Sequence, residues 1–133
     1  MFYMLDTDIS SYIIRERPLS FLDHYEHFLN QYNDTLCISS ITSSELLYGV
    51  LLKPSIKSLV ESFIASIEVL CWGEDAAYHY ADIRVSLKKK GITIGAHDMQ
   101  IAAHARSLGA KIVTNNEKHF RSVPGIIMEN WAS

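Results

Sequence analysis

The chain has 133 residues, of which 48% are hydrophobic and 20% are charged, and its formal net charge is −3 at pH 7. This length suits one compact domain over residues 1–133, and the apolar fraction is sufficient for a buried core. Charged residues interrupt each apolar stretch before the roughly 18 residues that a membrane span needs, and no basic residue precedes the short apolar run that ends at Asp6. We therefore expect a cytoplasmic protein without a membrane segment or a signal peptide, and the charge argues against a general nucleic-acid binder.

The net charge hides an uneven distribution along the chain. Residues 1–83 contain four Lys or Arg and twelve Asp or Glu, a net charge of −8, whereas residues 84–121 contain eight Lys or Arg and two acids, a net charge of +6. Such a separation suits a protein that holds a metal ion with one segment and a polyanion with the other. Solvated helix faces that happen to differ in charge explain it equally well.

The predicted elements begin with a strand and two helices. Residues 2–5 are a short apolar run, which predicts a buried strand, and residues 8–14 predict one or two turns of helix. Pro18 can take the first position of a second helix, over 18–33. Its apolar face, which we expect to contact a partner chain, carries residues at helical spacing: Phe21, Tyr25, Phe28 and Leu29.

The middle of the chain repeats this alternation. A strand is predicted over 35–39 and a helix over 42–52, and Pro54 begins another helix that extends to residue 67. Six apolar residues at helical spacing form the buried side of that helix: Ile56, Leu59, Val60, Phe63, Ile64 and Ile67. A third strand over 68–72 is followed by a turn at Gly73. The two cysteines, Cys37 and Cys71, lie in these apolar strands, so we expect reduced core thiols.

The last third of the chain contains two helices and two strands. A helix over 75–90 ends in three lysines and is stopped by Gly91, and a helix over 97–108 is stopped by Gly109. Short strands are predicted over 111–114 and 126–128. Strands that alternate with helices predict an α/β three-layer sandwich, in which helices flank a mostly parallel sheet of four or five strands.

Three acidic residues fall where such a fold gathers functional groups. Asp6 ends the first strand, and Glu45 and Asp98 each lie in the first turn of a predicted helix. The carboxyl ends of parallel strands meet at one edge of a sheet, where ligand sites form. Helix N-termini reduce the repulsion between crowded carboxylates, and a divalent cation such as Mg²⁺, with Mn²⁺ as the alternative, relieves the remainder.

Each acid also has an explanation without catalysis. Asp6 can cap the helix that follows it, Glu45 completes a capping box with Thr42, and Asp98 can interact with the dipole of its helix. The three explanations together require a coincidence, because all three acids lie at the same edge of the predicted sheet. We therefore favour a common site.

Four segments around these acids carry a family resemblance, and they lie in order along the chain at residues 3–9, 38–49, 94–103 and 112–120. Together they resemble the PIN-domain ribonucleases, and specifically the VapC-type toxins of bacterial toxin–antitoxin pairs. The resemblance covers essentially the whole chain. It implies a PIN-like fold, Mg²⁺-dependent hydrolysis of RNA phosphodiester bonds with tRNA as the leading substrate, a VapB-type antitoxin as partner, and a homodimer.

The resemblance also implies roles for individual residues. Asp6 and Asp98 match metal ligands, and Glu45 matches a third acidic member of the site. Thr7 and Thr114 match hydroxyl positions near it.

Two positions depart from the family pattern. Position 8 is Asp where many relatives have Asn, and position 116 is Asn where many relatives have a fourth acid. Asn116 can still orient a catalytic water or bind a second metal weakly, and Glu117 is a substitute one residue out of register.

Several basic residues are candidates for contacts outside the acidic site. Arg84, Lys88 and Arg106 are candidate phosphate contacts, although the lysine run from Lys88 also complements a helix dipole. His97 directly precedes Asp98 and is a candidate for contact with substrate. His24 and His27 lie one helical turn apart and are expected at a surface or interface.

Two other interpretations remain open at this point. The segment 6–10 fits the Asp-x-Asp-x-Ser/Thr loop of phosphatases that form an aspartyl phosphate, but Thr114 then comes after the distal acid Asp98 instead of before it. A receiver-like signalling domain would use Asp6 and Asp8 for metal, but it needs a phosphoacceptor Asp after a middle strand and a Lys after a late strand. Glu45 and Lys111 stand in the wrong places for these roles.

Overall fold

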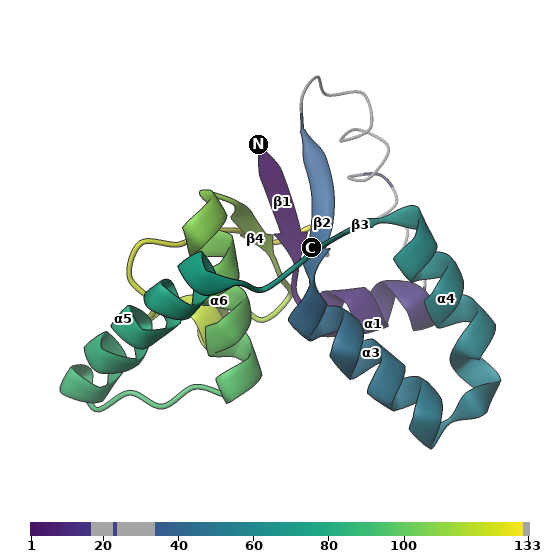
Figure 1. The fold of residues 1–133 in the computed structure, drawn as a ribbon, viewed down its shortest axis with the longest axis horizontal. Helices are drawn as coiled ribbons and strands as arrows, with labels where there is room; N and C mark the ends of the chain where they lie inside the picture. Colours follow the sequence, from purple (N-terminus) through teal and green to yellow (C-terminus); the bar gives the residue numbers. More distant parts are fainter. Residues whose placement is uncertain (17–22, 24–33, 132–133) are drawn as a thin grey trace.

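A parallel sheet forms the centre of the molecule in the computed structural model, which describes residues 1–16, 23 and 34–131 (Figure 1). Within the described part, five strands pair in the order β3-β2-β1-β4-β5, and every pairing is parallel. Their bounds are β1 (Phe2–Leu5), β2 (Thr35–Ser39), β3 (Glu68–Leu70), β4 (Lys111–Val113) and β5 (Ile127–Glu129). The first strand of the chain is thus the middle strand of the sheet, and its last residue, Leu5, pairs with Ile38 and Val113.

Helices lie on both sides of this sheet (Figure 1). One side carries α5 (Glu74–Lys90) and α6 (Ala96–Leu108), and the other carries α1 (Thr7–Glu16), α3 (Ser40–Leu52) and α4 (Lys57–Ser66). A short 3-10 turn (η1, Pro54–Ile56) precedes α4, and α7 (Glu117–Phe120) follows β4. The predicted α/β three-layer sandwich with a parallel sheet is confirmed. None of the described helices is both long and apolar enough to cross a membrane.

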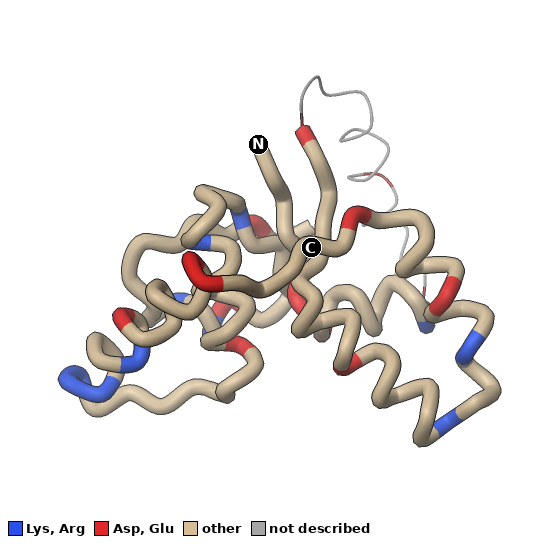
Figure 2. The backbone as a smooth tube through the Cα atoms, viewed as in Figure 1, with Lys and Arg blue, Asp and Glu red and all other residues tan. Residues whose placement is uncertain are grey.

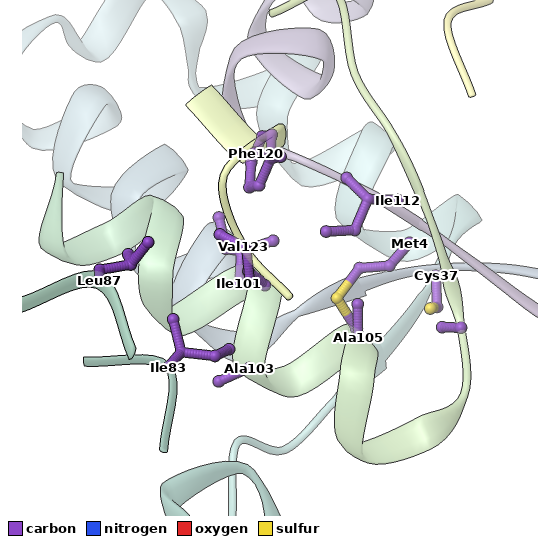
Figure 3. Close-up of a cluster of buried hydrophobic side chains, with 12 residues drawn as sticks. Met4, Cys37, Ile83, Leu87, Ile101, Ala103, Ala105, Ile112, Phe120 and Val123 are labelled. Carbon is purple, nitrogen blue, oxygen red and sulfur yellow. The ribbon is translucent and has the colours of Figure 1, made fainter. Parts of the chain in front are cut away.

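Alternating strand residues divide the core into two clusters. Met4 and Ile112 belong to the cluster beneath α5 and α6, whereas their neighbours Leu5 and Val113 belong to the cluster beneath α1, α3 and α4. This follows from the two-residue period of a strand, which places successive side chains on opposite faces. Figure 3 shows the first cluster, in which strand side chains meet Ile101 of α6 and its neighbours. Each aliphatic side chain buried there contributes about 1.5–3 kcal/mol to stability.

The helix ends agree closely with the predicted stops. Gly91 and Gly109 follow α5 and α6 in the left-handed conformation, with φ of 69° and 64°. The backbone N–H of each donates to carbonyl groups of the preceding turn. Glycine adopts this conformation without a steric penalty, which explains why both helices end where they do.

Other details of the prediction are wrong. The helix predicted over 54–67 is the separate elements η1 and α4. Of the six residues predicted on its buried side, only Leu59 is exposed, because the inward face of α4 runs through Val60, Phe63 and Ile64. Cys71 is exposed because β3 ends at Leu70, and the thiol therefore lies beyond the sheet. The four-residue helix α7 was not predicted. The predicted helix over 18–33, with its histidines and its apolar face, lies outside the described residues, apart from residue 23.

Candidate active site

Asp6 lies directly after β1, at the carboxyl edge of the sheet. Its backbone N–H donates to the carbonyl oxygen of Val113 (3.1 Å). Its Oδ1 accepts a hydrogen bond from the backbone N–H of Ile9 (2.7 Å), and its Oδ2 accepts one from the Thr114 hydroxyl (2.5 Å). The side chain is 2% exposed. Asp6 therefore caps α1, as the simpler explanation predicted, while its second oxygen is held by a strand end 108 residues later in the chain.

Burial makes the anionic form of Asp6 costly. It raises the pKa of the carboxyl from 3.8 to about 6, although the hydrogen bonds from Thr114 and Ile9 lower the pKa. The negative charges of Asp8 and Asp98 raise it further. A buried carboxylate beside other carboxylates is stabilised most by a cation.

Glu45 lies in the second turn of α3, not in the first turn as predicted. The helix begins at Ser40, and the hydroxyl of its N-cap, Ser39, accepts from the backbone N–H of Ile41 (3.1 Å). The capping box with Thr42 is therefore wrong, because Thr42 is a buried helix residue whose hydroxyl lies 3.1 Å from the hydroxyl of Thr7. Helix capping does not explain the presence of Glu45.

The carboxylate of Glu45 faces the acidic edge of the sheet. Its Oε1 accepts from the Thr7 hydroxyl (2.8 Å), and its Oε2 lies 2.7 Å from Nδ1 of His97. Thr7 begins α1, and His97 lies in the first turn of α6. The contacts of Glu45 thus join the starts of two helices that are distant in the sequence.

Asp98 lies in the first turn of α6, as predicted, after the N-cap Gly95. Its Oδ2 is 3.1 Å from Nδ1 of His119 in α7. Burial raises the pKa of the Asp98 carboxyl, the nearby His119 lowers it, and the charges of Asp8 and Glu45 raise it. The structure therefore brings the three predicted acids into one electrostatically coupled group.

The two positions that depart from the family pattern contact each other. The side-chain amide of Asn116 donates to Oδ2 of Asp8 (2.8 Å), and its backbone N–H donates to the Thr114 hydroxyl (2.9 Å). The same hydroxyl donates to Asp6, so a short chain of hydrogen bonds connects Asn116 to that carboxylate. Glu117 is exposed at the start of α7 and does not line the pocket described next.

Some of these residues line an open pocket of about 480 Å³ at the edge of the sheet, whereas Asp6, Thr114 and Asn116 are not among its lining residues. Its lining residues come from the starts of α1 and α6, from α3 and from α7: Thr7, Asp8, Glu45, Gly95, Ala96, His97, Asp98 and His119. His119 was missed by the sequence analysis because its helix was not predicted. His97, which was a candidate for substrate contact, lines the pocket.

The donors at this pocket suit a hard divalent cation in kind, because they are carboxylate oxygens beside hydroxyl groups. Among the described residues, no three His, Cys, Asp or Glu side chains lie close enough to hold a metal ion as they stand. His97 and His119 contact the carboxylates of Glu45 and Asp98 instead. Binding of a cation therefore requires these carboxylates to turn from the imidazoles toward the ion.

A parallel α/β sheet with a carboxylate-lined pocket at its carboxyl edge suits metal-assisted chemistry on phosphate esters, but it does not by itself distinguish a nuclease from a phosphatase. The sequence matches the PIN domain family over residues 3–126. It is 39% identical to Ribonuclease VapC2 of Rickettsia felis over 98% of each chain, and 39% identical to the tRNA(fMet)-specific endonuclease VapC of Salmonella typhimurium over 97% of each chain. The fold superposes on the crystal structure of VapBC2 from Rickettsia felis bound to a promoter DNA fragment with a TM-score of 0.92, at 37% identity, covering 98% of this chain and 99% of that chain.

The chain therefore belongs to the PIN-domain family and, within it, to the VapC ribonucleases. It is an enzyme of the class that hydrolyses RNA phosphodiester bonds, and PIN-domain nucleases generally use a divalent metal ion. This assignment replaces the phosphatase and receiver interpretations.

Proposed function

We propose that this chain, acting as a single PIN domain, is the toxin of a toxin–antitoxin pair and cleaves tRNA in the cytoplasm with the help of Mg²⁺. The observation that carries the proposal is the grouping of three acids at the carboxyl edge of the sheet. Glu45 and Asp98 line the pocket, and Asp6 is buried beside it, where the charge of Asp98 contributes to its raised pKa. These acids come from three separate segments, and neither charge balance nor helix capping accounts for all of them. Hydrolysis of a phosphodiester in a pocket lined by acids needs a cation to offset the charge.

Asp6, Asp98 and Glu45 would hold the ion, with Mn²⁺ as the alternative to Mg²⁺. When bound, such an ion lowers the pKa of a water molecule and stabilises negative charge on the phosphoryl oxygens. The chain's own residues prepare the site. Thr114 fixes the orientation of Asp6, and Thr7 does the same for Glu45.

Asn116 is the fourth member of the proposed catalytic set. Its amide holds Asp8 at the mouth of the pocket, where it can orient a water molecule. A neutral amide at this position makes a second metal ion a weaker expectation than the first.

The proposed substrate is a structured RNA that is cut at one or a few single-stranded positions. The relative from Salmonella typhimurium is named a tRNA(fMet)-specific endonuclease, and tRNA offers the splayed bases of its loops for recognition. The net charge of +6 over residues 84–121 is too small for tight binding that is independent of RNA sequence. Uniform degradation of total RNA at physiological salt would contradict this proposal.

The proposed partners are a VapB-type antitoxin and a second copy of this chain. The structures similar to this one include VapBC complexes from Rickettsia felis and Salmonella typhimurium bound to DNA. An acidic pocket attracts an Arg or Lys from another chain, which would displace the ion or block the substrate phosphate. We therefore expect the antitoxin to silence the enzyme with a segment that crosses the pocket.

The experiment that tests the function is sequencing of RNA 5′ ends after a short pulse of expression. New ends should appear at one or a few positions in tRNA. The same cleavage should occur with purified protein and Mg²⁺, and EDTA should abolish it. An unchanged set of RNA ends, together with normal growth, would refute the proposed function.

A further inference from the structure

A second hollow adjoins the acidic pocket. This groove of about 490 Å³ lies between α5 and the segment that leads into α6, and it is lined by Arg84, Lys88, residues 92–94 and Met99, among others. Residues 95–98 of the same segment line the acidic pocket. The two hollows are therefore on either side of one short stretch of chain. Thr93 and Asp98 are five residues apart, so their Cα atoms are separated by at most roughly 18 Å.

The charge of this groove is opposite to that of the pocket. Arg84 and Lys88 are four residues apart, on one face of α5, and no acidic residue lines the groove. Within the described residues, neither side chain forms an ion pair, and the guanidinium of Arg84 lies over the ring of Tyr80, 5.5 Å from its centre. Figure 2 shows the basic end of α5 as the most concentrated positive charge along the backbone.

The three basic residues that the sequence analysis suggested as phosphate contacts have different surroundings in the structure. Arg106 is occupied within the protein, because its side chain donates to Asp82 (2.6 Å), to the His79 ring (2.8 Å) and to the Pro124 carbonyl (3.2 Å). Lys88 lies in the last turn of α5, where it complements the helix dipole. Arg84 lies a full turn earlier, beyond the reach of that effect, so the dipole does not account for it.

We propose that this groove binds the RNA strand that continues from the bond to be cleaved. Arg84 and Lys88 contact its phosphates, and the apolar wall of Ile92, Ile94 and Met99 packs against a base or ribose. The inference rests on the proposed function. Its physical reason is that a pocket lined by carboxylates repels the phosphates on either side of the reacting one, so the attraction for the strand must come from adjacent residues.

The test compares two pairs of substitutions on the same helix. Arg84→Ala with Lys88→Ala removes the groove cations. Lys89→Ala with Lys90→Ala removes an equal charge from exposed positions that do not line the groove. Binding of initiator tRNA is measured by fluorescence anisotropy in EDTA over a range of salt concentrations, so that no cleavage occurs.

The groove pair should weaken binding by about ten-fold or more and reduce the slope of log affinity against log salt by about 1.4, the value for two phosphate contacts on a single strand. The control pair should stay within about two-fold of wild type, because it removes the same charge from positions outside the groove. With Mg²⁺ present, the groove pair should raise KM for tRNA and leave kcat unchanged.

Equal weakening by both pairs would overturn the proposal, because net charge alone would then explain binding. The proposal would also be overturned if the groove pair changed the mass measured by light scattering and left RNA affinity unchanged. The groove would then be a contact between protein chains. Groove-dependent binding by a wild-type protein that cleaves no RNA would refute the proposed function and leave the binding groove intact.

Discussion

At Asp6, one side chain caps a helix and also belongs to the group of acids beside the pocket. Its Oδ1 caps α1, and its Oδ2 accepts a hydrogen bond from the hydroxyl of Thr114, which follows the neighbouring strand β4. An asparagine at this position keeps the capping oxygen, because Asn and Asp are equally good N-cap residues. The amide substitution therefore removes the charge without removing the cap.

We expect Asp6→Asn, Asp98→Asn and Glu45→Gln to fold normally and to reduce the rate of tRNA cleavage by at least about 100-fold. Loss of a residue that only supports a metal ligand typically reduces activity by about 10- to 100-fold. The charge of the ligands, more than their size, holds a divalent cation. Because Glu45 is not a capping residue, its amide variant should be as inactive as the others. The measurement is cleavage in Mg²⁺ by variants whose thermal unfolding is checked separately.

Glu61→Gln is a matched control for these amide variants, since Glu61 is exposed on α4 and pairs with Lys57 (3.7 Å). It should cleave as the wild type does. Cleavage at the wild-type rate by either aspartate variant would contradict the proposed metal site.

The raised pKa of Asp6 makes stability depend on pH. Between pH 3.8 and about 6 the folded protein binds more protons at this carboxyl than the unfolded chain does, so its contribution to stability falls as the pH rises through this window. Without metal, Asp6→Asn should therefore be more stable than wild type at pH 7.5, by up to about 3 kcal/mol, and the gain should disappear near pH 4. Urea denaturation in EDTA at the two pH values measures the difference.

The same carboxyl should compete with protons for the metal. Affinity for Mn²⁺, measured by calorimetry, should fall as the pH drops through about 6, because the ligand must lose its proton to bind. An affinity that does not change between pH 5 and 7.5 would contradict a role for Asp6 as a ligand.

At the scale of whole elements, replacing glycine by alanine should have opposite effects on stability at two positions in the helices. Gly109 ends α6 with φ of 64°, whereas Gly49 lies inside α3, and an added Cβ meets no atom within 4 Å at either position. Gly109→Ala should lower stability by about 1 kcal/mol because of its left-handed backbone. Gly49→Ala should raise stability by about 0.5–1 kcal/mol, because alanine loses less entropy in a helix.

Thermal unfolding measures both effects, since 1 kcal/mol corresponds to a shift in Tm of roughly 4 °C at this size. Changes of the same sign in the two variants would contradict the assignment of these helix boundaries.

The elements that the sequence predicted well are those with strong local signals. Strands 2–5 and 35–39 have the predicted bounds because each is a compact apolar run, and the ends of α5 and α6 agree because glycine marks them. The start of α3 was placed two residues late, because a helix beginning at Ser40 has several serines and threonines that can cap it. Local signals could not identify which one does.

The site was predictable as a set of acids but not as a set of contacts. The position of an acid at a strand end or helix start is visible in the sequence, and the topology then brings the acids together. The partners of these acids are set by packing between distant segments, as with His119 and Asp98 or Thr7 and Glu45. No pattern along the chain marks such pairs.

At the scale of the whole molecule, α3 presents an apolar surface that the described residues do not cover. Leu51 and Leu52, near its C-terminal end, are 81% and 69% exposed, and Tyr48 is 64% exposed. Exposed apolar groups gathered on one helix are typical of contacts between chains. We expect these side chains to be buried in the interface of the proposed dimer.

We expect the purified protein to be at least a dimer in light scattering at micromolar concentration, and Leu51→Lys to reduce its mass to that of a monomer. A lysine buried without a partner in an apolar interface is strongly disfavoured. Leu108→Lys, at an exposed position in the last turn of α6, is the control and should leave the mass unchanged. A monomeric wild type would contradict the dimer and leave the nuclease assignment unaffected.

The hydrogen bond between Thr114 and Asp6 joins two residues that are synthesised at very different times during translation. The ribosome synthesises Asp6 105 residues before Lys111, which begins β4, the strand that completes the surroundings of Asp6. At bacterial rates of elongation the interval between the two is roughly 5 to 20 s. A nascent chain therefore carries Asp6 long before Thr114 can hold its carboxylate in place, so the site is complete only after β4 has been synthesised.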